Sequence, residues 1–493
     1  MSIMAPNFYE SNTSTDEPIV AKNQLLSITI PSPSEYNRNF DQGSQAAILR
    51  SLRAAGVQFI RFATVDAYNT IRCKTVPLAQ LSGHQRRVNN QASSPFSNPV
   101  SIAEIAFAGL PFSADVSSAP NLTAKNVLTL QPDFSSLRIL PYAKKTAMVM
   151  CTSHNQQSQE LSPLCTRGLL ERVLHSAKED MGIEFCVGAE LEFMLYGPNK
   201  DGVFQLVDSS TFANPTTLNE QEDFISALYD QLEQQDIPVE LIHSESAPAQ
   251  LEVVLGYSDN VVQLADDVVY ARETVINVAK QHGMKALFLP KTSMMTAGNG
   301  GHLHFSFREV GSSRNAFSDP SQPTGMSRKG ESFTEGLLDH LPSLLSFSIP
   351  TVNSFRRVGP GCWTGHSVGW STEDKESPVR VCVDLTTHQV SNVEMKLSDA
   401  TANIYLEIAM IISAGMEGIK NEKMLRPMMV VNENNAVPLP QSLQESLDSL
   451  KKDELLLSIL GIDLSTAYIA VREKDAQTKS TLEDEVAVAL NRA

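Results

Sequence analysis

The sequence Gly-Ala-Glu-Leu-Glu-Phe at residues 188–193 constrains this chain more than any other stretch. It continues a mostly apolar run, so we expect a strand over residues 183–195. Side chains two apart on a strand share a face, which directs Glu190 and Glu192 into the same space. Two carboxylates this close repel each other unless a cation lies between them. Taken alone, such a pattern is more often an exposed alternating edge strand. The acids and histidines further along the chain favour a cation site instead.

Further acids and histidines lie on or near other expected strands. Residues 239–243 and 302–306 read as strands, and they alternate with amphipathic helices expected over residues 165–181, 222–234 and 266–281. This alternation is typical of a sheet that lines one cleft. Five carboxylates and one imidazole suit Mg²⁺ or Mn²⁺ better than a thiolate-rich zinc site would, and balancing them needs two or more ions. The candidate metal ligands are Glu190, Glu192, Glu245, Glu252, His302 and Glu394.

The chain has 493 residues and a formal net charge of −17. Its length predicts two or more domains. Residues 1–40 lack periodicity and read as a flexible extension, and an expected hairpin of residues 57–65 and 70–76 belongs to a small α+β domain over residues 41–155. A large domain would occupy residues 156–493. The negative charge argues against nucleic acid or an anionic membrane as partner, and with no recognisable spanning segment or secretory signal we expect a soluble cytoplasmic protein.

Cationic residues follow the acids in sequence and are suited to hold phosphate or carboxylate. They are Arg356, Arg357, Lys375, Arg380 and Lys396. Acid-bound metal ions beside arginine and lysine form the electrostatic arrangement that phosphoryl transfer requires. Glycines at positions 298, 300 and 301 would let the backbone approach a ligand closely. They form neither a dinucleotide-binding fingerprint nor a P-loop, so neither of those modes of nucleotide binding is indicated.

The order of these motifs resembles the glutamine synthetase family, in particular its bacterial-type branch. The resemblance covers roughly residues 45–490 and includes GAELEF, ESAPAQLEV, GNGGHLHFSF, NSFRRVGPGCW, SPVRV and NVEMKLSDATANIYL. Each motif alone is weak, but their order and spacing are specific. The resemblance implies an α+β fold, with a small N-terminal β-grasp-like domain and a catalytic domain whose curved antiparallel sheet is flanked by helices. It also implies a homo-oligomeric ring of ten or twelve chains, with sites formed between neighbours.

The resemblance further implies ATP-dependent ligation, in which a carboxylate is activated as an acyl phosphate and then attacked by ammonia or an amine. His304 and Ser306 match positions that contact ATP. Arg380 matches an arginine that stabilises the transferring phosphoryl group, and Arg357 matches a second arginine facing the substrates. The family's two metal sites would be formed by Glu192, Glu245 and Glu252 and by Glu190, His302 and Glu394.

Several positions depart from the ammonia-using enzymes of that family. Ala108 replaces an aspartate that helps to bind ammonium, and Trp363 replaces a flap glutamate that deprotonates it. Lys375 replaces an arginine of the phosphoryl site, and Lys396 replaces the arginine that holds the substrate α-carboxylate. Lysine lacks the planar fork of arginine, so these two exchanges are not conservative. We expect substrate contacts at Ala108, Gly298, Trp363 and Lys396, and catalytic roles for Arg357, Lys375 and Arg380.

These departures predict a carboxylate-amine ligase that forms an amide, expected to be γ-glutamyl, from an organic amine. Two alternatives within the family stay open: a catalytically inactive ring with a regulatory role, and authentic glutamine synthesis with a rearranged ammonium site. A different class is a metal-dependent hydrolase built on His302 and His304, but the later histidines do not end clear strands. The sequence leaves the identities of the acid and the amine open.

Overall fold

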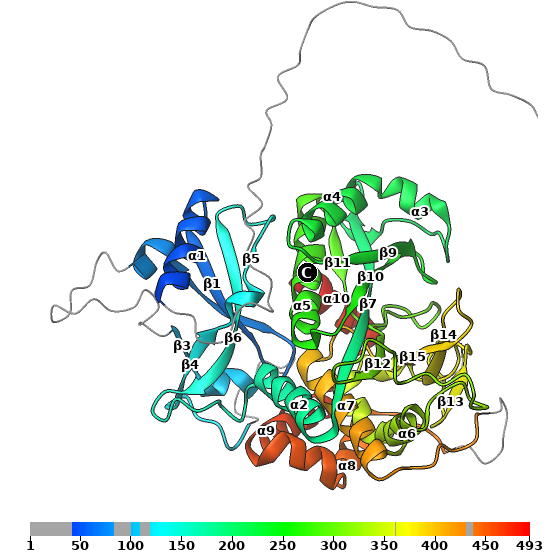
Figure 1. Cartoon of the computed structure of the whole chain (residues 1–493). Coiled ribbons are helices and arrows are strands. Elements are labelled where there is room, and N and C mark those ends of the chain that lie inside the picture. The colour runs from blue at the N-terminus through cyan, green and yellow to red at the C-terminus, as the bar shows by residue number, and fades with distance from the viewer. Residues whose placement is uncertain (1–41, 83–99, 109–118, 360, 430–436) are drawn as a thin grey trace, which may run out of the picture.

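The structure is a computed structural model, and it describes residues 42–82, 100–108, 119–359, 361–429 and 437–493. The expected flexible extension, residues 1–40, lies outside the described residues. The described chain forms two separate sheets with helices packed around them, as Figure 1 shows. This arrangement confirms the α+β class expected from the sequence.

The first sheet has six strands in the order β2-β1-β6-β4-β3, with β5 paired to β6. The predicted hairpin is confirmed, because β1 and β2 pair antiparallel from Phe59 and Pro77 to Val65 and Ile71. The elements of this part are α1 (Gln42–Ala54), β1 (Phe59–Val65), β2 (Ile71–Pro77), β3 (Val100–Ala103), the short helix η3 (Glu104–Ala108), β4 (Val127–Pro132), β5 (Arg138–Ile139) and β6 (Thr146–Asn155). The domain boundary expected at residue 155 stays a prediction.

The second sheet has nine strands in the order β13-β14-β15-β12-β7-β10-β9, with β8 and β11 also paired to β7. All its pairs are antiparallel except β13 with β14, and the sheet curves through the large part of the molecule (Figure 1). The strands are β7 (Ile183–Pro198), β8 (Phe204–Leu206), β9 (Val239–Ser244), β10 (Gln250–Ser258), β11 (Lys285–Leu287), β12 (Leu303–Glu309), β13 (Trp370–Thr372), β14 (Val379–Val383) and β15 (Val390–Met395).

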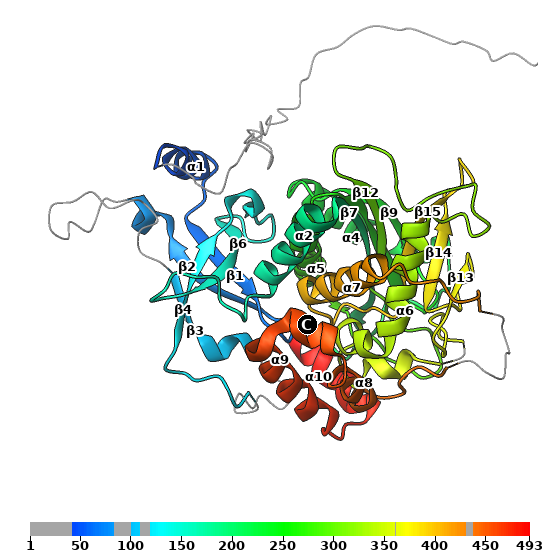
Figure 2. The same cartoon turned by 60° about the horizontal axis from the view of Figure 1, so that its bottom comes forward.

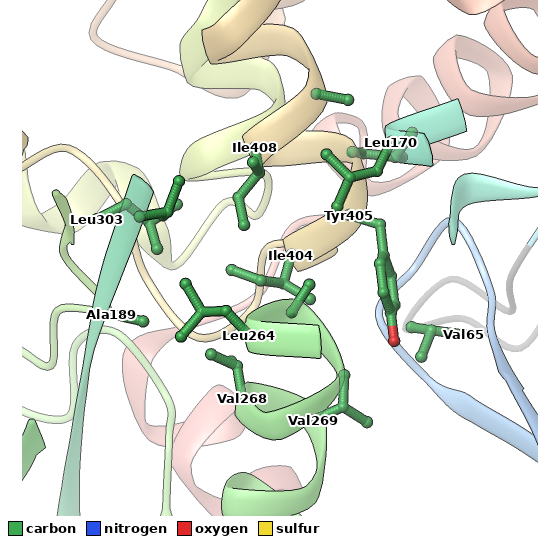
Figure 3. Close-up of a cluster of buried hydrophobic side chains, with 14 of the residues drawn as sticks. Val65, Leu170, Ala189, Leu264, Val268, Val269, Leu303, Ile404, Tyr405 and Ile408 are labelled. Atoms are coloured by element: carbon green, nitrogen blue, oxygen red, sulfur yellow. The ribbon is translucent and has the colours of Figure 1, made fainter. Parts of the chain in front are cut away.

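Helices cover one side of the second sheet (Figure 2). Ala189 and Leu303 on the sheet lie among Leu264, Val268 and Ile404 on the helices, as Figure 3 shows. Burial of this apolar surface is the main stabilising term for such a layer. The helices are α2 (Thr166–Met181), α3 (Pro215–Glu220), α4 (Glu222–Glu233), α5 (Val261–Gln281), α6 (Arg328–Ser348), α7 (Ile404–Lys420), α8 (Leu443–Leu450), α9 (Glu454–Ala476) and α10 (Leu482–Arg492).

By length and composition alone, α9 is the one helix in the described part of the chain that could cross a membrane. Its backbone is not continuous, because Gly461 has a left-handed φ of 74° and breaks the helix in two. Leu460, Leu464 and Tyr468 are buried, and α9 packs against α7 and α8. These contacts are those of a core helix.

A network of charged side chains joins the two sheets. Arg167 on α2 donates from Nε and Nη2 to both carboxylate oxygens of Asp266 on α5, at 3.0 and 2.8 Å, and from Nη2 to Asp133 at 2.6 Å. The hydroxyl of Tyr405 on α7 also donates to Asp266, at 2.6 Å. Arg138 on β5 lies 3.3 Å from Asp267. The guanidinium groups thus satisfy buried acids from both parts of the chain.

Candidate active site

Strand β7 lies at the centre of the site because its neighbours bring acids and histidines to the same face. In the β7–β10 pair, Glu252 lies directly opposite Glu192. On the other side, His304 of β12 lies opposite Gly188 of β7 and opposite Glu394 of β15. Opposite residues on neighbouring antiparallel strands are about 5 Å apart at Cβ, so the strand register alone gathers these groups.

Glu190 lies between two imidazoles. Its Oε2 is 2.8 Å from His302 Nδ1, and its Oε1 is 3.1 Å from His304 Nε2. Burial acts to raise the pKa of Glu190, but the hydrogen bonds to His302 and His304 outweigh it and hold that pKa well below its usual value. Glu190 is therefore a carboxylate in the metal-free protein.

Glu192 has the opposite electrostatic environment. Its Oε2 accepts hydrogen bonds from Gln250 Nε2 and from the Gly300 amide, both at 2.8 Å. Burial and the neighbouring Glu252 nevertheless raise the pKa of Glu192 to about 8, although Arg357 acts against them. The pKa of Glu252 is raised as well, mainly by burial. Two buried acids whose pKa values are raised in this way would be stabilised as carboxylates by a bound cation.

His243 belongs to the cluster, although it was not among the predicted ligands. Its Nε2 lies 2.9 Å from Glu252 Oε1 and 3.9 Å from Glu245 Oε1. The hydrogen bond to Glu252 raises the pKa of His243 to about 9. The sequence contained a signal for it, because His243 is near the end of an expected strand and only two residues before Glu245.

Glu394 on β15 lies beside two cations. Arg380 Nε, directly across on β14, donates to its Oε2, and Lys396 Nζ is 3.3 Å from its Oε1. Its Oε1 is also 3.6 Å from His302 Nδ1. Burial acts to raise the pKa of Glu394, but Lys396 and His302 lower it to about 2. The predicted phosphoryl-site arginine therefore lies at the edge of the acid cluster.

Three sets of side chains place ligand atoms within 4.8 Å of one another. These sets are Glu190, His304 and Glu394; Glu190, Glu252 and His302; and His243, Glu245 and Glu252. Five of the six predicted metal ligands belong to these sets, and the sixth, Glu192, adjoins them with its Oε1 3.7 Å from His302 Nδ1, but the grouping differs from the expected one. His304 and His243 join the triads, whereas Glu192 makes its hydrogen bonds to Gln250 and Gly300. Oxygen-rich sets with imidazole fit hard divalent cations such as Mg²⁺ and Mn²⁺.

The glycine-rich segment lies so close to site residues that a side chain at Gly298 or Gly300 would overlap them. A Cβ on Gly300 would lie 2.4 Å from His302 Nε2 and 2.8 Å from Glu192 Oε1, and one on Gly298 would lie 2.2 Å from Pro290 O and 2.8 Å from Arg357 Cγ. Arg357 itself donates from Nη1 to Ser398 O at 3.0 Å. The close approach of a ligand to these glycines, expected from the sequence, stays a prediction, and protein atoms already limit the space around Gly298 and Gly300.

A cavity of about 630 Å³ opens beside β7 and β12. Its lining includes the two predicted nucleotide-contacting residues, His304 and Ser306, together with Glu190, Tyr257 and Arg308. Cavities of about 300–1,000 Å³ are typical of small-molecule and cofactor sites. A nucleotide in this cavity would meet the acid cluster at Glu190, which is where metal-bound phosphates would have to lie.

Three predicted site residues lie apart from the cluster. Lys375 is exposed in the loop between β13 and β14. The Trp363 side chain is 48% exposed, and its backbone has a left-handed φ of 58°. Ala108 is 1% exposed at the end of η3 in the first sheet's part of the chain. Among the described contacts, none joins Ala108 to the acid cluster of the same chain.

The family model described as the glutamine synthetase catalytic domain matches residues 163–488. The chain belongs to the glutamine synthetase family. It is 31% identical over 366 residues to a glutamine synthetase of Methanocaldococcus jannaschii, covering 71% of this chain and 79% of that protein. It is 29% identical over 452 residues to a gamma-glutamylpolyamine synthetase of Streptomyces coelicolor, covering 89% and 94%. The crystal structure of a novel glutamine synthase homologue superposes with a TM-score of 0.76 at 23% identity, over 89% of this chain and 99% of that one.

Membership of the glutamine synthetase family confirms the resemblance seen in the motifs and the predicted fold. It makes this protein a ligase that forms C–N bonds, within a family that uses ATP and a divalent cation. The acid cluster and the adjoining 630 Å³ cavity provide donors and space that fit both. The alternative of a metal-dependent hydrolase is excluded by the family.

Proposed function

We propose that this protein uses ATP to join a carboxylate, most simply the γ-carboxylate of glutamate, to an organic amine. The observation that carries the proposal is the indole of Trp363 at the position of the family's flap glutamate. Thr364 Oγ1 donates to the main-chain oxygen of Arg357 at 2.8 Å, which anchors the segment beside the proposed substrate arginine. Trp363 presents about half of its side chain to solvent there. An aromatic face in place of an acid favours packing against a carbon substituent or a cation–π contact with an aminium group.

The similarity to a gamma-glutamylpolyamine synthetase along 89% of the chain supports an amine as the second substrate. The acid cluster supports ATP chemistry, because its carboxylates can hold the divalent cations that neutralise the phosphates of ATP. We propose Mg²⁺ or Mn²⁺ for this cluster, held by Glu190, Glu192, Glu245, Glu252, His302 and Glu394, with His243 and His304 adjoining.

In the proposed reaction a carboxylate oxygen of the acid attacks the γ-phosphorus of ATP, and ADP leaves. The amine nitrogen then attacks the acyl carbon, phosphate leaves, and the nitrogen gives up a proton as the amide forms. The bound cations would supply charge neutralisation at the phosphates. Arg380 and Arg357 would add fixed positive charge on the phosphoryl side, and Lys396 would hold a substrate carboxylate as a point charge. Lys375 would have to move inward to take part.

We also propose a closed ring of ten or twelve identical chains, soluble in the cytoplasm. Ala108 and the acid cluster have no described contact within one chain, so a site containing both requires the small part of one chain to lie against the large part of its neighbour. Such head-to-tail contacts close into rings. Mass photometry at micromolar concentration should detect decamers or dodecamers, and a sample of monomers and dimers would contradict the ring.

The substrate test compares initial rates with ammonium and with a panel of alkyl, aryl and polyamines, at saturating ATP and glutamate. Ammonium should be the poor nucleophile, because a positioned general base typically contributes about 10²–10⁴-fold and is missing at Trp363. Products are identified by mass spectrometry. A preference for ammonium would contradict the proposal, and the absence of turnover with any acid would favour the inactive regulatory ring instead.

Two variants sharpen this comparison. Trp363→Glu restores an acid at the flap position and should raise the ammonium rate relative to the amine rate. Trp363→Gln is its matched control, because it removes the indole without supplying a base. If both variants change the ratio equally, the effect comes from space and not from proton removal.

A further inference from the structure

A second cavity of about 370 Å³ shares no lining residue with the cavity beside β12. It lies between α5, β11, the turn that joins β1 to β2, and α10. Figure 1 shows α10 beside α5 and β11, and both α5 and α10 pack on β11. The proposed ligase reaction makes no use of it. Its volume is within the range of small-molecule sites.

The lining of this cavity, which we call the α10 cavity, combines apolar side chains with two arginines. Ile276, Phe288, Val352 and Val488 contribute apolar side chains, Arg492 lies on α10, and Arg272 donates to the main chain of two other lining residues. Such a lining, mostly apolar with a few placed polar groups, is the usual composition of a ligand pocket. It fits a molecule with an apolar body and one anionic end.

Arg272 is held in place by the main chain. Its Nη1 donates to Ala400 O at 3.2 Å and its Nη2 to Asn69 O at 3.1 Å. Among the described residues, no carboxylate lies within ion-pair distance of Arg272. Burial lowers the pKa of Arg272, although Glu273 and Asp66 act against that effect. A half-buried guanidinium without an acidic partner gains most from a carboxylate that forms charge-assisted hydrogen bonds.

The acids in the same lining limit the charge of the ligand. Glu485 on α10 is already bound by Arg356, at 3.1 Å, and by Asn353, at 2.6 Å. Asp475 also lines the cavity. A phosphate dianion would be repelled by these neighbours more strongly than a monoanion, so the lining favours a carboxylate.

We propose that the α10 cavity binds a small monocarboxylic acid with an apolar body, with its carboxylate on Arg272, and that this binding is coupled to the acid cluster of the active site. The coupling follows from the segment at residues 398–401. Ala400 O accepts from both Arg272 and Asn69, the latter at 2.9 Å. Ser398 O accepts from Arg357 at 3.0 Å and from the Gly301 amide at 3.1 Å. A carboxylate that redirects Arg272 therefore acts on the segment that positions Arg357 and the glycines beside His302.

The binding test uses isothermal titration of the full-length protein with sodium 4-phenylbutyrate, and with 4-phenylbutyramide as the uncharged match. The carboxylate should bind once per chain, and the amide about tenfold or more weakly, because it loses the charge-assisted contact. Arg272→Gln should weaken the carboxylate to the level of the amide. Equal binding of acid and amide, or no saturable binding of the acid, would overturn the site.

Arg272 also joins two parts of the chain, so its replacement could impair folding. Ala489→Phe on α10 provides an independent variant, because it fills the cavity and leaves Arg272 in place. It should abolish binding of 4-phenylbutyrate without changing the circular dichroism spectrum. Lys396→Gln serves as the active-site control. Loss of binding in Lys396→Gln together with full binding in Ala489→Phe would place the acid in the active site and overturn the proposal.

The coupling test measures the Mn²⁺ affinity of wild type with and without saturating 4-phenylbutyrate. Coupling between two sites typically changes affinity about 5–150-fold, and it is reciprocal, so Mn²⁺ must change the affinity for the acid by the same factor. This readout needs no turnover, so a failure of the ligase assignment would leave it unaffected. An unchanged Mn²⁺ affinity with the α10 cavity occupied would refute the coupling.

Discussion

On one face of β7, Glu190 contacts His302 and Glu192 accepts a hydrogen bond from Gln250. The residues between and before them, Leu191 and Ala189, belong to the hydrophobic core, and Figure 3 shows Ala189 facing helices α5 and α7. Both faces are buried: Leu191 is 2% exposed and Glu192 is 5% exposed. Burial of Leu191 is favourable, at roughly 25 cal/mol per Å² of apolar surface. Burial of Glu192 is unfavourable, which its raised pKa of about 8 records. One residue step along a strand thus separates a position that stabilises the fold from one that needs a ligand.

The junction between the two sheets shows a different treatment of buried acids. Asp266 receives a two-pronged contact from Arg167 and a hydrogen bond from Tyr405, so protein donors satisfy it. Glu192 and Glu252 face each other across β7 and β10 with a histidine, an amide side chain and a main-chain amide as donors. Protein donors thus satisfy the acid at the junction, whereas Glu192, whose pKa is raised by burial and by Glu252, lies where a divalent cation fits.

The largest effect on stability is expected on the apolar face. Leu191→Ala should lower the free energy of unfolding by about 2–5 kcal/mol, because it leaves a cavity in the helix–sheet layer. Urea denaturation followed by circular dichroism measures the change. The exposed Val203 provides the control, and Val203→Ala should change stability by no more than about 0.5 kcal/mol. The folded Leu191→Ala protein should still bind Mn²⁺ normally; a large loss of affinity would contradict the separation of the two faces.

On the acidic face, a substitution should weaken Mn²⁺ binding and stabilise the metal-free fold, which is the opposite of the result expected for Leu191→Ala. Glu192→Gln should weaken Mn²⁺ binding by more than about 100-fold, since removing a partner that only orients a ligand already costs about 10–100-fold. The metal-free variant should melt at a higher temperature than wild type, because glutamine removes the cost of burying an ionisable group there, and with it the repulsion with Glu252. Calorimetry and thermal melts measure the two changes. Glu184→Gln is the matched control on the same strand, where the acid is paired with Lys178 and Arg308; unchanged Mn²⁺ binding by Glu192→Gln would show that Glu192 is no ligand.

A smaller loss of Mn²⁺ affinity, about tenfold, is expected from Gly300→Ala. The new Cβ would overlap His302 Nε2 and crowd Glu192 Oε1, so both ligands must shift. Gly188→Ala is the control, because its new Cβ would lie 3.6 Å from His304 Cβ, which is an ordinary van der Waals distance. Its Mn²⁺ affinity should equal that of wild type. Equal affinities for the two variants in calorimetric titration would show that the Gly300 contact does not shape the site.

The smallest effect concerns the pH dependence of the junction between the sheets. Burial raises the pKa of Asp267 to about 7, although Arg138 acts to lower it. Between roughly pH 4 and pH 7, Asp267 is therefore protonated in the folded protein and ionised in the unfolded chain. The stability that this bound proton contributes is present at low pH, and it is lost as the pH rises through about 7. Asp267→Asn should reduce the fall in melting temperature between pH 5 and pH 8. The exposed Asp230 gives the control, and Asp230→Asn should leave that fall unchanged; equal slopes in all three proteins would remove Asp267 as its cause.

Local sequence patterns predicted much of the candidate site. The alternation at residues 188–193 correctly predicted a strand with two acids on one face, and the motif order correctly predicted the family and fold. His243 was missed, although it ends a strand two residues before Glu245, because a single histidine has many roles in proteins. The close contacts of Gly298 and Gly300 with Arg357 and His302 join residues far apart in sequence, which no local pattern records.

The sequence by itself determined which residues are acids, cations or apolar and which of them share a strand face, since side-chain direction alternates with a period of two. It also contained Ala108 and Trp363, which by the resemblance to the ammonia-using enzymes replace two acids and on which the amine proposal rests. Only the tertiary structure decided the pairing of β7 with β10 and β12, and with it the hydrogen-bond partners of each acid. It alone decided the raised pKa of Glu192 and the lowered pKa of Glu394, because burial and charge separation depend on distances across strands and not on spacing along the chain.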